Sequence, residues 1–150
     1  MDGAVLKKAI LLMNERDGLD NMIFEQAFHK KIIGKFKELS KNQPMVIKII
    51  GTEGEVMPST IGNYTGMSKS SLTRMVDDLE KKGIVSRRTD PEDRRKVLVS
   101  LTDKGLECYN YSNEIVDELL NLVDENDVYE YLQSLEATVK ILNKIACRRT

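Results

Sequence analysis

The sequence contains very few of the residues from which metal and redox centres are built. Among its 150 residues there is one histidine, His29, and the two cysteines, Cys108 and Cys147, are far apart. A histidine-rich metal site is therefore excluded, and the spacing of the cysteines does not form a C-x-x-C motif. We predict no metal and no cofactor. Inert, reduced thiols are favoured, with redox sensing as the alternative.

Long apolar stretches and familiar catalytic motifs are also missing. No stretch approaches the roughly 20 apolar residues that cross a bilayer, and the N-terminal residues lack the pattern of a secretory signal. We find no glycine-rich phosphate loop and no nucleophile motif. With 41% hydrophobic and 31% charged residues, the chain has the composition of one soluble globular domain. We expect a cytoplasmic protein that has no contact with membranes and is not an enzyme.

What the sequence does contain is a run, from residue 67 to 105, that predicts a helix, a hairpin and the start of another helix. The first helix should begin after Ser68, whose hydroxyl can accept hydrogen bonds from free backbone N–H groups. It should end before Gly83, which suits the position just after a helix. Its apolar residues recur at helical spacing, so they predict one buried stripe: Leu72, Met75, Val76 and Leu79.

The hairpin follows directly. Residues 84–88 and 96–101 are rich in β-branched and apolar side chains, and the Asp90-Pro91 dipeptide between them marks a turn. Thr102 is a candidate N-cap for the next helix, although Gly105 in its first turn weakens the helix preference.

The outward face of the helix and the charged hairpin have the side chains expected of a DNA-binding surface. Short polar groups and Arg74 can reach base edges in a major groove, while arginines at a hairpin tip can reach phosphates or a minor groove. The same pattern, taken alone, also fits an ordinary solvated surface. The residues that we predict to contact DNA are Ser68, Lys69, Ser70, Ser71, Thr73, Arg74, Arg87, Arg88, Asp93, Arg94 and Arg95.

The distribution of charge favours the DNA-binding interpretation. The whole chain has a net charge of only -1, but residues 69–96 contain 9 Lys/Arg against 6 Asp/Glu. Residues 102–136 contain one basic residue against ten acidic ones. Positive charge is therefore concentrated where the groove-reading elements should lie, and the acidic segment cannot face DNA.

This run resembles the MarR family of bacterial and archaeal winged-helix regulators. The family pattern is SKS-x-x-TR, then L-x-x-x-G-I/L-V, a D-x-x-D-x-R wing and L-T-x-x-G. Several independent positions agree with it at the right spacings. The matching residues are Ser68, Lys69, Ser70, Thr73, Arg74, Leu79, Gly83, Ile84, Val85, Asp90, Asp93, Arg95, Leu101, Thr102 and Gly105.

The resemblance implies a mainly α-helical protein with a small β-hairpin, in which a winged helix-turn-helix core is flanked by N- and C-terminal dimerisation helices. It implies a homodimer that presents two recognition helices to a pseudo-palindromic operator in double-stranded DNA. It also implies a small-molecule effector pocket where the dimerisation helices meet the winged region. Phe28, His29 and Tyr111 are candidates for its wall, although Phe28 also fits an ordinary core position. The prediction is a sequence-specific, ligand-responsive repressor; the alternative is a winged-helix protein-interaction module without specific DNA binding.

We expect one MarR-like domain over residues 1–150, with the DNA-binding region at 40–102 and the dimerisation helices at 1–39 and 103–150. Residues 40–43 read as an S-x-x-Q capping box before a helix that reaches Gly51, and Pro58 should open a short helix that ends at Tyr64. The flanking segments have more apolar helix surface than the winged core can cover, which favours a dimer over a monomeric bundle. Their apolar positions include Met22, Ile23, Phe24, Ala27, Phe28, Ile32, Ile33 and Phe36, and two further helices are expected at 109–123 and 128–145.

The first 16 residues precede the helix that should open the family fold. Their apolar residues have helical spacing, and Asp17-Gly18 should break the run. The segment is either an added helix or the first half of a long kinked one.

Overall fold

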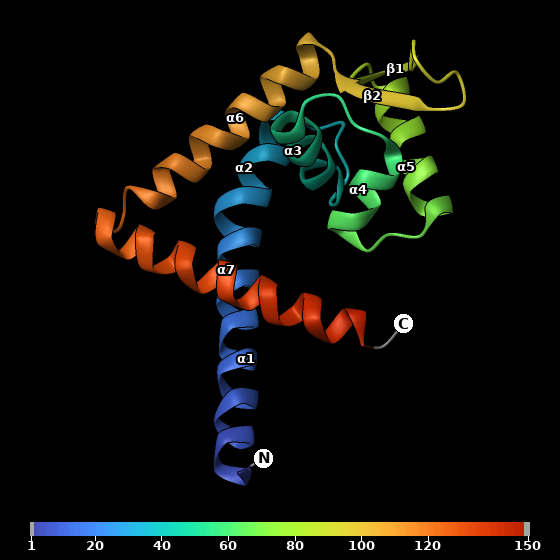
Figure 1. Ribbon diagram of the computed structural model, residues 1–150. Helices are drawn as coiled ribbons and strands as arrows, with labels where there is room; N and C mark the ends of the chain where they lie inside the picture. The colour runs from blue at the N-terminus through green and yellow to red at the C-terminus, as the bar shows by residue number, and fades with distance from the viewer. Residues whose placement is uncertain (1, 149–150) are drawn as a thin grey trace. The chain divides into compact units, whose positions relative to one another are not determined.

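The computed structural model describes residues 2–148, apart from the side chains of residues 24–26, among them the predicted apolar residue Phe24. The chain divides into two compact units, residues 1–114 and 115–150, and each is described by itself. The first unit contains eight of the ten elements completely, up to strand β2, together with the larger part of α6; the second contains the rest of α6 and all of α7 (Figure 1). The prediction of a mainly helical protein with a small hairpin is confirmed.

Three helices form the helix-turn-helix and share one core. They are α3 (Gln43–Glu53), α4 (Pro58–Thr65) and α5 (Lys69–Lys81). The predicted stripe of α5 is buried at Leu72, Val76 and Leu79, and Met75 is half-buried at its edge. Burial of each such side chain contributes about 1.5 to 3 kcal/mol, so this stripe fixes which face of α5 remains outside. The other buried residues of the three helices include Val46, Ile47, Ile50 and Ile61.

Both ends of α5 are specified as the sequence predicts. The Ser68 hydroxyl accepts from the backbone N–H of Ser71 at 3.2 Å. At the other end Gly83 has a φ of 70°, a left-handed conformation that glycine adopts without strain. The N–H groups of Gly83 and Ile84 donate to the carbonyls of Glu80 and Leu79, which completes a Schellman motif. The helix therefore stops where the first strand of the hairpin has to begin.

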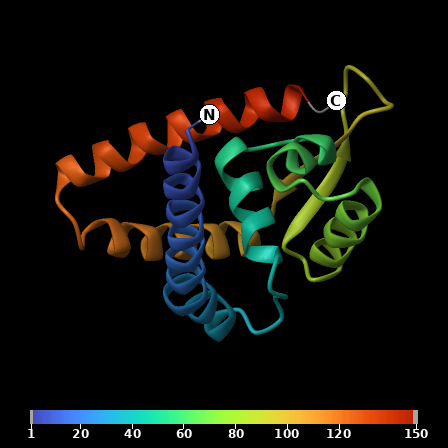
Figure 2. The same ribbon diagram turned by 90° about the horizontal axis from the view of Figure 1, so that it is seen from below.

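The wing is a two-stranded antiparallel hairpin. Strands β1 (Val85–Thr89) and β2 (Val97–Leu101) pair with Val85 opposite Leu101 and Thr89 opposite Val97. A single bridge between Val56 and Val99 ties β2 to the segment between α3 and α4. In Figure 2 the loop that joins the two strands extends beyond the helix-turn-helix. The predicted hairpin is thus confirmed to within one residue at each strand boundary.

Gly105 lies in the first turn of α6 (Asp103–Leu120) because a larger residue has no room there. A Cβ on Gly105 would lie 2.2 Å from the Ile84 carbonyl oxygen. The predicted N-cap is also present, since the Thr102 hydroxyl accepts from the Gly105 N–H at 3.2 Å and donates to the Gly83 carbonyl at 2.6 Å. The low helix preference of glycine is therefore outweighed by close packing between α6 and the start of the wing.

Two local predictions at the N-terminal side are wrong. Helix α1 (Gly3–Ile23) continues through Asp17 and Gly18 and is followed by π-helical turns (Phe24–His29) and by α2 (Lys30–Lys35). One internal glycine costs about 1 kcal/mol relative to alanine, which does not end a helix, and Arg16 pairs with Asp20 at 3.7 Å across the expected break. Helix α3 starts with Asn42, not Ser40, as its N-cap, and only half of the predicted capping box forms.

The second unit contains α7 (Glu125–Cys147), which begins with a complete capping box. The Asp124 carboxylate accepts from the Asp127 N–H at 3.0 Å, and the Asp127 carboxylate accepts from the Asp124 N–H at 3.4 Å. Of the described residues of α7, none is buried. The predicted pair of C-terminal helices is confirmed, with each helix longer than its apolar pattern indicated. Of the helices in the described part of the chain, none is long and apolar enough to cross a membrane.

Candidate DNA-binding surface

The predicted base-reading residues lie together on the solvent side of α5. All six, from Ser68 to Arg74 without the buried Leu72, are exposed. They occupy the N-cap and the first two turns of the helix, and the opposite end of α5 leads into the hairpin (Figure 1). The amino-terminal half of a recognition helix is the part that contacts base edges in helix-turn-helix proteins. These six residues are Ser68, Lys69, Ser70, Ser71, Thr73 and Arg74.

Hydrogen bonds within α5 organise the hydroxyl groups of this surface and leave its Arg74 guanidinium available. Ser68 bonds to the Ser71 hydroxyl at 2.9 Å, and Thr73 donates to the Lys69 carbonyl at 2.9 Å. Within residues 2–148 the Arg74 side chain makes no hydrogen bond or ion pair with another described residue. The surface therefore combines pre-oriented hydroxyl groups with a cation that can donate two hydrogen bonds to one guanine.

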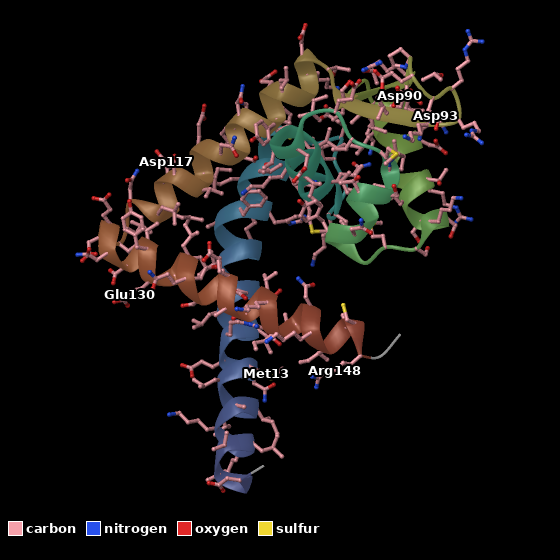
Figure 3. The ribbon with its side chains drawn as sticks, in the orientation of Figure 1. Met13, Asp90, Asp93, Asp117, Glu130 and Arg148 are labelled. Atoms are coloured by element: carbon pink, nitrogen blue, oxygen red, sulfur yellow. The ribbon has the colours of Figure 1, made fainter. Side chains whose placement is uncertain are left out.

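Two aspartates shape the tip of the wing (Figure 3). The Asp90 carboxylate accepts from the Glu92 N–H at 2.8 Å, and the Asp93 carboxylate accepts from the Arg95 N–H at 3.1 Å. Each contact is an Asx turn, which holds the chain in a tight bend. Arg94 and Arg95 are exposed, and the Arg95 side chain is 93% exposed although its Nε lies 3.4 Å from Asp93. The tip thus presents two cations on a braced loop.

Arg87 and Arg88, which we also predicted to contact DNA, face carboxylates of their own chain. Arg87 bonds to Asp77 at 2.5 Å and to Glu80 at 3.0 Å, so it attaches β1 to the exposed side of α5. Arg88 makes a two-pronged pair with Glu55, whose pKa is lowered by the hydrogen bonds from that guanidinium. Sequence patterns gave no signal for these partners, because the carboxylates lie 7 to 33 positions away along the chain.

A polar cluster behind α5 was also missed by the sequence patterns. Gln43, at the start of α3, is 1% exposed, and its amide donates to the Asp78 carboxylate at 2.6 Å. Lys82 donates to the same carboxylate at 2.6 Å and to the Gln43 amide oxygen at 2.9 Å. Hydrogen bonds from Lys82, the larger cause, and from Gln43 lower the pKa of Asp78. The S-x-x-Q pattern identified Gln43 as a capping residue but gave no sign of this contact.

The three residues predicted for an effector pocket are placed differently from one another. Phe28 is 5% exposed and belongs to the core, with the Lys48 ammonium 5.2 Å from its ring centre. His29 is half-buried at the end of the π-helical turns. The Tyr111 ring packs against Phe36, with centroids 6.0 Å apart, and the Lys35 ammonium lies 4.3 Å from its centre. Their role in ligand binding stays a prediction.

The cysteines have contrasting surroundings. Cys108 is buried, and burial raises the pKa of its thiol to about 11, which favours the protonated thiol at neutral pH. Cys147 is exposed at the end of α7. Among the described residues no group of three or more histidine, cysteine or carboxylate side chains is arranged to hold a metal ion.

Comparison with known proteins agrees with this architecture. A model of the MarR family matches residues 39–97. The HTH-type transcriptional regulator SarZ of Staphylococcus saprophyticus is 31% identical over 116 residues, which cover 70% of this chain and 80% of SarZ. Among the curated relatives, the matched segment spans between 40% of one relative and 96% of another.

Two solved structures extend the similarity over nearly the whole chain. The transcriptional regulator BldR from Sulfolobus solfataricus is 29% identical, with a TM-score of 0.70 over 96% of this chain and 99% of BldR. FabT from Streptococcus pneumoniae, solved in complex with DNA, is 21% identical, with a TM-score of 0.69 over 89% of this chain and 99% of FabT; it supports the fold alone. With its helix-turn-helix, its braced wing and these relatives, the chain belongs to the MarR family and is a DNA-binding transcriptional regulator, not an enzyme.

Proposed function

We propose that this protein is a homodimer that binds a pseudo-palindromic operator in double-stranded DNA and represses transcription until a small molecule binds. One observation supports the operator contact above all others. Residues 68–76, which are the N-cap and the first eight residues of α5, include no carboxylate. The Arg74 guanidinium among them makes no hydrogen bond or ion pair with another described residue. A helix face of this kind can approach the phosphate-lined major groove without electrostatic repulsion.

Nearby carboxylates support the same proposal because arginines and a lysine of the same chain neutralise them. Asp77 and Glu80 pair with Arg87, Asp78 pairs with Lys82, and Glu55 pairs with Arg88. The acids on and beside α5 therefore repel DNA less than their number suggests.

We divide the predicted contacts into two groups. Arg74 reads a base edge, with Ser68, Lys69, Ser70, Ser71 and Thr73 around it, and Arg94 and Arg95 meet phosphates or the minor groove. An indirect role, that of holding the wing in place, falls to Arg87, Arg88 and Asp93, because their side chains bond to other groups of the same chain. This division narrows the larger set that the sequence predicts.

The flanking helices support the dimer. Helices α1 and α7 contain no buried residue, yet both expose many large apolar side chains. Residues 1–39 and 103–150 are the proposed dimerisation region, and 40–102 the proposed DNA-binding region. Two symmetry-related recognition helices would then enter successive major grooves about 34 Å apart. A protein with this role acts in the cytoplasm, where the operator is.

The effector site is proposed near Phe28, His29 and Tyr111. What supports it is their position on the helices that flank the winged core, from which a ligand could shift the spacing between two recognition helices. An aromatic-lined cavity there would suit a small organic molecule. Substitution of Tyr111 by alanine should then reduce the response to an effector more than it reduces operator affinity.

Selection of bound duplexes from a random DNA pool tests the proposal. We expect an inverted repeat whose two half-sites lie about one helical turn apart, bound by two chains per duplex with a steep salt dependence. Sedimentation of the complex gives its stoichiometry. Recovery of unrelated sequences bound with equal affinity would contradict operator recognition and would instead favour the protein-interaction module, for which the comparisons offer no support.

A further inference from the structure

Gln43 is a buried polar residue whose amide joins two helices. It lies at the first position of α3, and its partners Asp78 and Lys82 lie at the end of α5, 35 and 39 positions further along the chain. All three contacts are between 2.6 and 2.9 Å. Buried amides of this kind have to be satisfied, because an unmatched polar group costs about 1 to 3 kcal/mol.

The amide of Gln43 has a matched partner on each side. Its oxygen accepts from the Ser40 N–H and from the Lys82 ammonium, each at 2.9 Å, and its nitrogen donates to Asp78 at 2.6 Å. The orientation of the amide is thereby fixed, since reversing it would set the NH₂ group against two donors and the oxygen against a carboxylate. The cluster thus specifies one arrangement of α3 relative to α5.

The same turn of α5 is also bonded to the flanking helices of the first unit. Lys104, in the first turn of α6, donates to the Lys82 carbonyl at 3.0 Å and pairs with Glu38 at 2.8 Å. Glu38 lies between α2 and α3. The segments on either side of the winged core therefore both connect to the last turn of α5.

We propose that Gln43, Asp78 and Lys82 form a positioning cluster that sets the angle of the recognition helix, and that operator selectivity depends on it although none of the three touches DNA. This proposal rests on operator reading by α5, as proposed above. Gln43 is buried on the inner side of α5, so direct DNA contact does not explain its role.

The geometry of α5 explains why an anchor at one end affects reading at the other. Ser70 and Asp78 are eight residues apart, which is roughly 12 Å along the axis at a rise of about 1.5 Å per residue. A tilt of about 5° at the anchor would move the reading residues by about 1 Å, which is enough to spoil base-edge hydrogen bonds but not phosphate attraction. Loss of the cluster should therefore reduce selectivity more than it reduces nonspecific binding.

An exchange of the amide and the carboxylate tests the proposal. Gln43→Glu sets two carboxylates against each other, and Asp78→Asn leaves Lys82 without its carboxylate. The double variant Gln43→Glu with Asp78→Asn restores one carboxylate, one amide and one ammonium in the same places. Asn42→Asp is the matched control, because it adds the same charge at an exposed neighbouring position.

Affinities for the selected operator and for a scrambled duplex are measured for the full-length dimer, together with thermal unfolding of each variant. The wild-type ratio of the two affinities first establishes operator reading, so its absence would count against the proposed function. We expect Gln43→Glu to lower this ratio about tenfold and the double variant to restore it to within about threefold, as coupled neighbours do. Asn42→Asp should leave the ratio unchanged.

Three results would overturn the positioning role. The first is an unchanged ratio in folded Gln43→Glu. The second is a parallel loss of operator and nonspecific binding with a lower Tm, which is the behaviour of a purely structural contact. The third is a double variant no better than the product of the two single variants.

Discussion

The winged core and the flanking helices differ in how completely one chain covers their apolar side chains. In the core, α3, α4, α5 and the hairpin supply buried residues from every element, such as Ile50, Ile61, Val76 and Val99. In α1 and α7 the described residues include none that is buried. The core therefore has a packed apolar interior, whereas α1 and α7, each taken within its own unit, leave their large apolar side chains exposed.

The pattern of apolar side chains on α7 supports the proposed dimer. Its apolar side chains repeat at spacings of four and three residues, at Leu132, Leu135, Val139 and Leu142, and all four are between 44% and 55% exposed. This repeat is typical of helices that pack lengthwise against other helices. In the dimer that we propose, a second copy of the same chain would supply the matching repeat.

The largest predicted effect is weakening of the proposed dimer when apolar residues of α7 are replaced by charged ones. Leu135→Asp with Leu142→Asp should raise the dissociation constant of the proposed dimer by at least about 100-fold, because each leucine that the interface buries would contribute about 1.5 to 3 kcal/mol and symmetry counts it twice. Analytical ultracentrifugation over a range of concentrations measures the change.

Gln133→Asp with Asn143→Asp is the matched control, since it adds the same charge to polar positions of the same helix. A chain that ends at Asp124 should aggregate or unfold for the same reason. If that truncated chain were instead a well-folded monomer that binds DNA, the dimerisation role of α7 would be refuted.

The second prediction concerns Gly62, in α4 of the winged core, and Gly105, where α6 packs against that core. Gly105→Ala should lower the free energy of unfolding by about 1 to 3 kcal/mol, because its Cβ would lie 2.2 Å from the Ile84 carbonyl oxygen. Gly62→Ala should raise it by up to about 1 kcal/mol, because a Cβ there meets Leu72 at an ordinary 3.6 Å and helix preference improves. Urea denaturation measures both, and a stabilised Gly105→Ala variant would show that the packing at this site is looser than the structure indicates.

These two glycines also show what local sequence patterns can predict. Periodicity and caps predicted α5 and the hairpin to within about one residue, because Ser68, Gly83 and the buried stripe act within one element. By the same rules Gly105 is unfavourable, because what requires a glycine there is the close approach of the Ile84 carbonyl, from the turn between α5 and β1. Local rules therefore give the elements but not the packing between them.

In the candidate DNA-binding surface, too, the sequence predicted local features but not the contacts between elements. The exposed hydroxyls, Arg74 and the wing-tip arginines could be identified from the sequence, because exposure follows from the apolar periodicity. The ion pairs of Arg87 and Arg88 and the contacts of Gln43 could not, because each partner is brought close only by the fold. A basic stretch therefore shows where arginines lie in the sequence but not which carboxylates they pair with in the fold.

A third prediction separates function from folding within the winged core. Arg74→Ala should cost about 1 to 3 kcal/mol of operator binding and relax the preference at one or two positions per half-site, with no change in the free energy of unfolding. Lys81→Ala, an exposed cation at the far end of the same helix, is the control and should keep the sequence preference. Affinities for single-base operator variants measure the effect. Equal weakening on every sequence would place Arg74 among the phosphate contacts.

The smallest predicted effect concerns the wing tip, where Arg94 is the proposed DNA contact and Asp93 holds the loop in shape. Arg94 is exposed and within the described residues makes no ion pair, so Arg94→Ala should weaken operator and nonspecific DNA alike and make the log-log salt dependence shallower by about 1. Asp93→Ala removes the carboxylate that accepts from the Arg95 N–H and lies 3.8 Å from the Lys96 ammonium. It should loosen the loop that presents the arginines, with little change in the free energy of unfolding. Titration of both variants against one operator duplex at several salt concentrations distinguishes the roles, because only removal of a phosphate contact changes the slope by a full charge. An Arg94→Ala variant with the affinity and slope of the wild type would show that the tip of the wing does not touch DNA.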